Sequence, residues 1–499
     1  MSSDQAFLLP PRVDEWVPPG HLARVVDEAI DLLDLSAAEA AFHTTGAGAP
    51  AYPPKLLLKR LTYGYLTQRF GSRRISSACR EDLALMWRAR LQQPQHSVLA
   101  AFRTQHAEDL PGWMAQVVLV CLDLGLVGLK LGALDGSKFQ ADASKHQAMS
   151  YQRMQEALPA LEAEIATLVV RQGAADAEEA SPPAVPADRL ARLQARLDRI
   201  RQAKADLEDR RAAEHPEDPT PPDGTPINFT DPDAHIMVTK TRGVQQAYKG
   251  QGVVDATAGV IVGATLSAHP NDQQEPAPAL TAVETATGGG PFDQLTADAG
   301  YCSAGNVAGA EAHHVDAYIA AGADAWRQVK GQTLYGTGQF TYDAPTNTYR
   351  CPAKQRLPWH HTRTEAVGGE ATRTVEVYRG DRATCGACPL KAQCLTPKQR
   401  QKRLTRGADD AARDAMKAKV RTPAGDTIYR TRKGQVESAF GIIKETLGFR
   451  QFSVRGQTQC AGEWALVCLT YNVRKIAAAL RRRARDTGAI CSLRDLRAG

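Results

Sequence analysis

The stretch Leu129–Ser137, which reads Leu-Lys-Leu-Gly-Ala-Leu-Asp-Gly-Ser, marks the point where helical patterning gives way to sheet patterning. It predicts a strand over Leu129–Asp135 that ends at the aspartate and is followed by Gly136. Sheet patterns return at Val244–Ala256 and Val260–Ala268, which we expect to form a hairpin. These strands predict a sheet-containing core that begins near residue 129.

Two further strands and a helix continue the pattern. Strands are predicted at Gln294–Asp298 and Val315–Ala320, with a helix near Ser303–Ala312 between them. The strand–helix–strand order is typical of α/β domains, in which ligands gather at the carboxyl ends of strands. We assign residues 129–149 and 227–341 to the first part of this α/β core.

Residues 1–128 are predicted to form an all-helical domain. Apolar residues recur at helical spacing over His21–Leu35 and Lys55–Phe70, a third helix is expected over Ser72–Arg90, and Ser97 is expected to cap a fourth. Several arginines are expected on the surface of these helices: Arg69, Arg73, Arg74, Arg80, Arg88, Arg90 and Arg103. A helix-turn-helix DNA binder fits this pattern, and so does a helical bundle with a solvated basic face.

Residues 150–226 interrupt the core with two helical segments. Their apolar residues fall at heptad-like spacing, and Ser181–Pro186 separates the two segments. The Pro-rich stretch His215–Pro226 closes the insertion. We expect an inserted antiparallel helical hairpin.

Residues 342–397 are predicted to form a small, loop-rich insert that carries cysteines. Its candidate metal ligands are Cys351, Cys385, Cys388 and Cys394, with His360 and His361 as substitutes for one of them. Four thiolates suffice for a closed tetrahedral zinc site, whereas an iron–sulfur cluster fits less well. Reduced cysteines packed inside the insert are the alternative. The remaining cysteines are expected to fill hydrophobic cores: Cys79, Cys121, Cys302, Cys460, Cys468 and Cys491.

Positive charge is concentrated in one segment. The chain has 61 Lys and Arg against 55 Asp and Glu, a net charge of +6 that says little about a partner. Lys398–Lys433 alone holds twelve basic and four acidic residues, a larger excess than that of the whole chain. A charge run is usually a solvated face, but the position of this one just before Glu437 favours a track for the DNA backbone.

Two helices are predicted near the end of the chain, over Thr427–Lys444 and Glu463–Arg485. Between them lie two aromatic and two basic residues that could stack on DNA or pack in the core: Phe449, Arg450, Phe452 and Arg455. We assign residues 398–480 to the segment that completes the core, and 481–499 to a basic tail.

The composition is that of an ordinary globular protein. Forty Gly and 29 Pro among 499 residues exclude a collagen-like or low-complexity chain. The chain has no run of about 18 apolar residues, and its first residues lack the basic start and apolar core of a signal peptide. We therefore expect a cytoplasmic protein.

Three carboxylates are candidates for one site. Asp135 and Asp298 each follow a predicted strand, and Glu437 lies on a predicted helix. Three convergent acids repel one another unless a divalent cation neutralises them, and Mg²⁺ leaves coordination positions for phosphate oxygens. The rival acids are Asp142, expected to cap a helix, Asp272, expected in a turn, and Asp316.

The residues around these acids carry a resemblance. The stretches in question are Leu134–Ser137, Asn228–Asp233, His269–Asp272, Ala297–Tyr301, Tyr429–Lys444, Gly448–Gly456, Glu463-Trp464 and Tyr471-Asn472. In this order they resemble the DDE transposases of bacterial insertion sequences, in particular the group with a helical N-terminal domain, a helical-hairpin insertion and a cysteine-bearing insert before the catalytic glutamate. The resemblance covers roughly residues 8–480.

The resemblance implies a ribonuclease-H-like catalytic core, a mixed sheet flanked by helices. Asp135, Asp298 and Glu437 would be the catalytic residues and would hold Mg²⁺ or Mn²⁺, with two ions serving phosphoryl transfer. The implied DNA-binding residues are Tyr429, Arg432, Lys433, Lys444 and Arg450.

One spacing departs from that of related transposases, which often place three residues between the arginine and the glutamate. Here four residues separate Arg432 from Glu437, and Lys433 has the usual gap instead. The six-residue gap from Glu437 to Lys444 is intact. Either Arg432 or Lys433 could therefore take the basic role.

The function implied is that of a transposase that binds terminal inverted repeats, cuts the element ends and joins them to target DNA. Pairing two ends implies a homodimer, for which the helical hairpin would be a dimerisation or DNA-contact device. A bacterial, nucleoid-associated location follows. The alternatives are a metal-dependent nuclease without strand transfer, and a DNA-binding regulator derived from a transposase.

Overall fold

The computed structural model describes residues 12–40, 52–88, 92–177, 187–239, 243–268, 276–322, 326–329, 331–366, 372–488 and 492–493. The chain divides into two compact units. Unit 1 comprises Met1–Pro270, Pro278–Asp293 and Arg432–Gly499, and unit 2 comprises Asn271–Ala277 and Gln294–Thr431. In the described part of the chain, no helix is long and apolar enough to cross a membrane.

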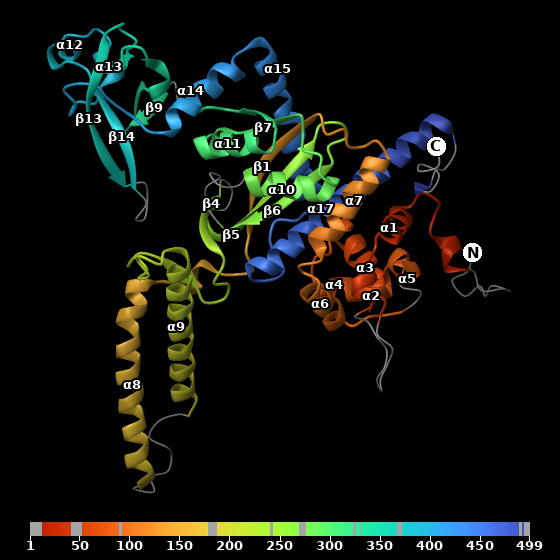
Figure 1. The fold of residues 1–499 in the computed structure, drawn as a ribbon. Helices are drawn as coiled ribbons and strands as arrows, with labels where there is room; N and C mark the ends of the chain where they lie inside the picture. The colour runs from red at the N-terminus through yellow and green to blue at the C-terminus, as the bar shows by residue number, and fades with distance from the viewer. Residues whose placement is uncertain are drawn as a thin grey trace. The chain divides into compact units, whose positions relative to one another are not determined.

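The N-terminal part of unit 1 is helical, as predicted (Figure 1). Its helices are η1 (Val13–Trp16), α1 (Leu22–Asp31), α2 (Ser36–Ala40), α3 (Pro54–Leu66), α4 (Ser72–Glu81), α5 (Leu83–Arg88), α6 (His96–Gln105) and α7 (Leu110–Asp123). The single helix expected over Ser72–Arg90 was wrong. It is broken at Asp82, whose carboxylate accepts hydrogen bonds from the N–H groups of Ala84 and Leu85.

Two further local predictions in this part were also wrong. Ser97 lies inside α6 and does not cap it, because the N-cap position is occupied by Gln95. Arg103 is buried and not exposed. Its guanidinium donates to Glu463 Oε1 (3.2 Å), the Tyr65 hydroxyl (2.9 Å) and Ser453 Oγ (2.7 Å). This buried ion pair joins α6 to α17 (Gln457–Thr487).

The sheet of unit 1 is built on two long antiparallel strands. These are β1 (Leu131–Gln140) and β5 (Gly243–Asp255). Two shorter strands, β4 (His235–Thr239) and β6 (Ile261–Ser267), also pair antiparallel with β5, so the predicted hairpin is present. The strand expected to end at Asp135 continues to Gln140, which places this aspartate in the middle of β1.

Two glycines on β5 let helices approach the sheet closely. In the register of β1 and β5, Gly252 lies opposite Asp135 and Gly250 opposite Ser137. A Cβ atom at Gly250 would lie 2.9 Å from the Trp464 ring on α17, and one at Gly252 would lie 3.6 Å from Phe440. Because paired residues project to the same face, Asp135 and Ser137 lie on the face that these two aromatic residues cover. On the sheet, β6 packs closely on α10 (Pro276–Thr287) through Gly263.

Helix α17 is held on this sheet by hydrogen bonds from its side chains. The Trp464 indole donates to the Gln251 carbonyl (2.9 Å). Asn472 both accepts from the N–H of Ile261 (2.9 Å) and donates to its carbonyl (2.8 Å). The Tyr471 hydroxyl donates to the Gly259 carbonyl (2.8 Å). The pairs Glu463-Trp464 and Tyr471-Asn472 therefore anchor α17 to its neighbours.

The insertion forms two helices that pack against each other in Figure 1, α8 (Tyr151–Ala177) and α9 (Ala187–Glu214). A buried cluster joins them: Tyr151, Met154, Leu161, Leu197, Ile200, Ala203, Leu207 and Ile227. A two-stranded sheet of β2 (Ala148–Ser150) and β3 (Pro226–Asn228) lies at the base. The predicted separator Ser181–Pro186 lies outside the described residues.

Unit 2 contains a parallel pair of strands and a separate antiparallel sheet. The parallel strands are β7 (Gln294–Ala297) and β8 (Asp316–Ile319), with η3 (Ala299–Tyr301) and α11 (Ala304–Ala312) between them in sequence. The antiparallel sheet has the order β11 (Thr341–Asp343), β12 (Thr348–Arg350), β13 (Arg356–Ala366), β14 (Thr372–Arg379) and β15 (Arg403–Arg406). A smaller pair is β9 (Trp326–Val329) with β10 (Gln332–Tyr335), and η4 is Thr337–Gln339.

The expectation that residues 342–397 are loop-rich was therefore wrong. Alternating side chains pack one face of this sheet into a core of Tyr335, Phe340, Leu357, Tyr378 and Leu404. The remaining helices of unit 2 are α12 (Arg382–Gly386), α13 (Lys391–Cys394), α14 (Asp409–Val420) and α15 (Pro423–Arg432). Helix α15 ends at Arg432, where the last segment of unit 1 begins. The chain as a whole is of the mixed α/β class, as predicted.

Candidate active site

Asp135 lies in a strand and is held by a cation. Its Oδ2 atom accepts from the Arg432 guanidinium at 2.9 Å, and its Oδ1 atom accepts from the N–H of Gly136 at 2.8 Å. The side chains of Asp135 and Arg432 are mostly buried, with 22% and 12% of their surfaces exposed. Partial burial strengthens this ion pair, because its charges are screened less than they would be in water.

The chain around Glu437 is a helix with two wide turns. After α15 come a π-helical turn at Lys433–Glu437 (η5), the short α16 (Ser438–Gly441) and a second π-helical turn at Ile442–Thr446 (η6). A π turn closes i→i+5 hydrogen bonds and so takes one residue more than an α turn. Residues five apart across such a turn lie on the same side of the helix.

The first π turn explains the unusual spacing noted in the sequence. Arg432 and Glu437 are five apart and are joined by η5, which accommodates the additional residue. Arg432 is the residue that reaches Asp135, whereas Lys433 is exposed. Glu437 is the last residue of η5 and is also exposed.

Lys444 brings a second cation to β1. Its Nζ donates to Ser137 Oγ (2.5 Å) and to the Lys138 carbonyl (3.2 Å), and it lies 4.8 Å from the centre of the Phe139 ring. Burial lowers the pKa of Lys444, and the nearby Arg450 acts in the same direction. Lys444 is therefore not a solvent-exposed surface lysine. Within unit 1, β1 thus carries an acid between two cations from one helical segment.

Asp298 belongs to unit 2. It follows β7 directly, as predicted, and caps η3 by accepting from the N–H of Gly300 at 2.8 Å. Tyr429 lies on α15 and is half-buried. The structure thus brings Asp135, Arg432 and Lys444 together in unit 1, and describes Asp298 and Tyr429 within unit 2.

The rival acids have local partners. Asp142 follows β1 and pairs with Arg455 (2.9 Å), and the helix expected to begin there is absent. Asp316 begins β8 and pairs with Lys419 (2.5 Å). Despite the opposing effect of burial, that lysine helps to lower the pKa of Asp316. Asp272 lies outside the described residues.

The four candidate zinc ligands of unit 2 line one small cavity. Cys351, Cys385, Cys388 and Cys394 surround a space of about 80 Å³, together with Gly380 and Lys402. The Cys351 sulfur accepts from the N–H of Gln355 at 3.3 Å. A Cβ atom at Gly380 would lie 2.8 Å from the Cys385 sulfur, so glycine allows the strand to approach the thiol. His360 and His361 do not line this cavity.

Among the described residues, no three His, Cys, Asp or Glu side chains are already arranged to hold a metal ion. The scattered cysteines Cys79, Cys121, Cys302, Cys460 and Cys468 are buried and free, as predicted for core residues, and Cys491 lies outside the described residues.

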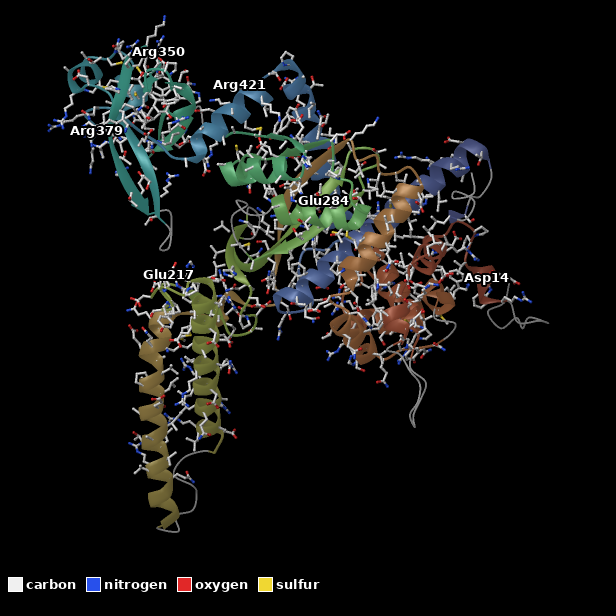
Figure 2. All side chains as sticks on the ribbon, in the orientation of Figure 1. Asp14, Glu217, Glu284, Arg350, Arg379 and Arg421 are labelled. Atoms are coloured by element: carbon white, nitrogen blue, oxygen red, sulfur yellow. The ribbon has the colours of Figure 1, made fainter. Side chains whose placement is uncertain are left out.

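The basic segment Lys398–Lys433 divides into two sets. Six of its cations have a partner within the protein: Lys402, Arg406, Arg413, Lys419, Arg430 and Arg432. For the other six, all described, the structure shows no side-chain hydrogen bond or ion pair: Lys398, Arg400, Arg403, Lys417, Arg421 and Lys433. Arg421, labelled in Figure 2, is exposed at the end of α14.

The aromatic and basic residues after the second π turn also separate. Phe449 and Phe452 are buried in the core, so they do not face a ligand. Arg450 and Arg455 are exposed and pair with Glu445 and Asp142.

Sequence reasoning missed two buried polar groups beside Gly136, on the face of the sheet opposite to Asp135. Lys249 and Gln251 on β5 lie beside Gly136, where a Cβ atom would come within 2.5 Å of Lys249 Cε and 2.4 Å of Gln251 Oε1. Both side chains are buried. The alternation of polar residues with Gly250 and Gly252 was the available signal.

Comparison with curated proteins gives no match. Two family models match separate parts of the chain. A transposase DDE domain matches residues 350–477, a range that includes Glu437, and a second transposase domain matches residues 11–105. Asp135 and Asp298 lie outside both ranges. Both matches are to transposase domains, in the order that the resemblance predicted, and together they indicate a DDE transposase of the insertion-sequence family, a DNA transposase.

Proposed function

We propose that this transposase binds the terminal inverted repeats of its element, cuts the ends and joins them to target DNA on a ribonuclease-H-like core. One observation carries the proposal. Asp135 on β1 lies beside Arg432 and next to Ser137, which Lys444 contacts, and both cations come from the segment that bears Glu437. An acid flanked by cations suits a phosphodiester, which is an anion that must be held while its phosphorus is attacked.

The two cations would bind and orient the DNA backbone. Arg432 has a planar fork of donors that can bind two phosphate oxygens, and Lys444 provides a point charge. Both are partly buried, so their charges are less screened than those of surface lysines. Negative charge that develops on the phosphoryl oxygens would thus be stabilised by groups already in place.

Members of the DDE domain family depend on divalent metal ions, and we propose Mg²⁺ or Mn²⁺, two ions, held by Asp135, Asp298 and Glu437. The donor set fits, because oxygen ligands from a few carboxylates are what Mg²⁺ prefers. A bound ion supplies Lewis-acid polarisation of the phosphate and acidifies water.

The proposed DNA contacts are the N-terminal helices, the unpartnered cations of Lys398–Lys433, and Tyr429, Lys433 and Arg450. The helical hairpin α8–α9 is proposed to serve the pairing of two ends in a homodimer. A deletion of Tyr151–Arg211 that changed neither the oligomeric state nor end pairing would contradict this role.

We further propose that the four cysteines of unit 2 bind a structural zinc ion. Their shared cavity supports this, since one ion with four thiolates fits a space of that size. The Gln355 N–H that points at Cys351 would stabilise a thiolate. Metal analysis of the purified protein should find about one zinc per chain.

The test is cleavage and joining of labelled element ends with Mg²⁺ or Mn²⁺. Asp135→Asn, Asp298→Asn and Glu437→Gln should each abolish both steps, while Asp142→Asn, a matched change on an exposed acid, should leave both intact. Cleavage without joining of pre-cut ends would indicate a nuclease instead. Full activity of Asp298→Asn would refute the site.

A further inference from the structure

Unit 2 carries a group of arginines of which only Arg403 belongs to the basic segment Lys398–Lys433. Arg379 on β14 is influenced electrostatically by three others: Arg363 on β13, Arg382 on α12 and Arg403 on β15. His360 and His361 lie among them. We call these six residues the arginine face. Arg379 is labelled in Figure 2.

The strand register places like charges opposite each other. Arg379 on β14 is the direct partner of Arg403 on β15. Directly opposed like charges destabilise a sheet, so the fold itself gains nothing from this pair. Burial, followed by Arg403, Arg382 and Arg363, lowers the pKa of Arg379.

Of these four arginines, only Arg363 is neutralised by a nearby acid. Glu365 pairs with Arg363 and Arg373, and the Asp381 carboxylate accepts from the N–H and hydroxyl of Thr384. Glu376 accepts from the Tyr378 hydroxyl. Arg379, Arg382 and Arg403 therefore have no acidic partner among the residues that the structure describes.

The two histidines are neutral in this arrangement. Arg379 Nη1 donates to His360 Nε2 (3.2 Å), and His360 Nδ1 is 2.7 Å from His361 Nδ1. Since an arginine can only donate, His360 accepts through Nε2 and donates through Nδ1. His361 then accepts at Nδ1 and retains a donor at Nε2. Burial and the surrounding cations lower the pKa of His361, which agrees with this assignment.

Arg379 also has an unused donor. Its Nε atom is buried and makes no hydrogen bond in the described part of the chain. The arginine face thus combines several cations, free donors and unrelieved repulsion, all of which a polyanion would satisfy.

From this geometry we infer that the arginine face is a second DNA-binding surface, which contacts phosphates of the duplex backbone without reading its sequence. The inference rests on the proposed function only in taking DNA as the ligand. Phosphates would relieve the repulsion between Arg379 and Arg403, and arginine suits them because its donors can bind two oxygens at once. Arg363, Arg379 and Arg403 lie on the paired strands β13, β14 and β15, so the positions of these three side chains are set before DNA arrives.

The experiment measures binding of the full chain to a fluorescent duplex of arbitrary sequence by anisotropy, in buffer without Mg²⁺ or Mn²⁺, over a range of salt concentrations. Arg379→Ala/Arg403→Ala should weaken binding roughly tenfold and reduce the salt slope by about two, since each lost phosphate contact lowers it by about one. The control is Arg373→Ala/Arg430→Ala, which removes the same charge from exposed arginines that already pair with Glu365 and Asp426. Its effect on both quantities should be less than half as large.

Two further measurements guard against misfolding. The melting temperature of Arg379→Ala/Arg403→Ala should be unchanged or raised, because repulsion is removed, whereas a merely structural role would lower it. Arg403→Glu, at an exposed position, should weaken binding at least as much, and Arg379→Lys/Arg403→Lys should restore most of the affinity.

An unchanged salt slope in the double alanine variant would overturn the inference. So would loss of affinity for a structured RNA with duplex affinity intact. Because the proposed cleavage needs Mg²⁺ or Mn²⁺, neither result depends on catalysis. A chain that binds through this face yet cannot join ends would refute the proposed function alone.

Discussion

Arg103 in unit 1 and Arg379 in unit 2 are the same residue type in opposite settings. Arg103 is 6% exposed and its guanidinium meets Glu463, Tyr65 and Ser453. Arg379 meets a histidine and faces other arginines. A buried arginine that is paired with an acid favours one packing of the chain, whereas surface arginines without an acidic partner remain available to bind an anion. The partners of an arginine, and not its residue type, therefore indicate whether it stabilises the fold or is available to bind a ligand.

Removing the partner of Arg103 is expected to have the largest effect on stability. Glu463→Gln should lower the free energy of unfolding by about 3–5 kcal/mol, because it leaves an uncompensated buried charge. Urea unfolding monitored by circular dichroism measures this. A loss below about 1 kcal/mol would show that the ion pair of Arg103 and Glu463 contributes no more to stability than an exposed ion pair does.

Zinc is expected to contribute the next largest effect, in unit 2. If the ion is hundredfold above its dissociation constant, chelation should lower the stability of this unit by about 2.7 kcal/mol. Differential scanning calorimetry with and without a chelator tests this, and Cys388→Ser should abolish the difference. The core cysteine variant Cys121→Ser serves as control, since it should keep the response to chelator. A chelator-insensitive wild-type protein would leave the four cysteines as packing residues.

A smaller loss of stability is expected from disturbing the close packing of α17 on the face of the sheet that carries Asp135. Gly250→Ala introduces a Cβ atom 2.9 Å from the Trp464 ring and should cost about 1–3 kcal/mol through overpacking. Gly434→Ala, in a place where a Cβ atom meets nothing within 4 Å, is the matched control. Equal unfolding midpoints for the two variants would mean that α17 can move away from β5 freely.

The smallest effect is expected at an exposed ion pair. Arg450 and Glu445 are 42% and 69% exposed, so Glu445→Gln should change stability by less than about 1 kcal/mol. Because the chemical change is the same as in Glu463→Gln, the difference between the two losses of stability measures the contribution of burial to the ion pair. Similar losses for the two variants would contradict the contrast between enclosed and open charges.

Much of the secondary structure was predictable because it depends on neighbouring residues. The 3.6-residue period over His21–Leu35 and the alternation over Val244–Ala268 both correspond to observed elements, α1 and the β5–β6 hairpin. The same reasoning failed at residues 342–397, where polar strands resemble loops until they pair. It also placed Asp135 at the end of a strand, because Gly136 and Ser137 look like a turn until β5 pairs with them.

The sequence by itself determined that the chain is a mixed α/β protein with a helical beginning, and it identified the motifs around Asp135, Asp298 and Glu437 through which the chain resembles transposases. Only the tertiary structure decided which partner each charged side chain has. Arg432 and not Lys433 contacts Asp135, and Lys444 contacts β1. Arg103 is buried, and Arg379 and Arg403 lie opposite each other on paired strands. The physical reason is the separation along the sequence between the residues that interact. A helix or strand is set by residues a few positions apart, but the partner of a charge lies elsewhere in the chain, as Glu463 lies 360 residues from Arg103.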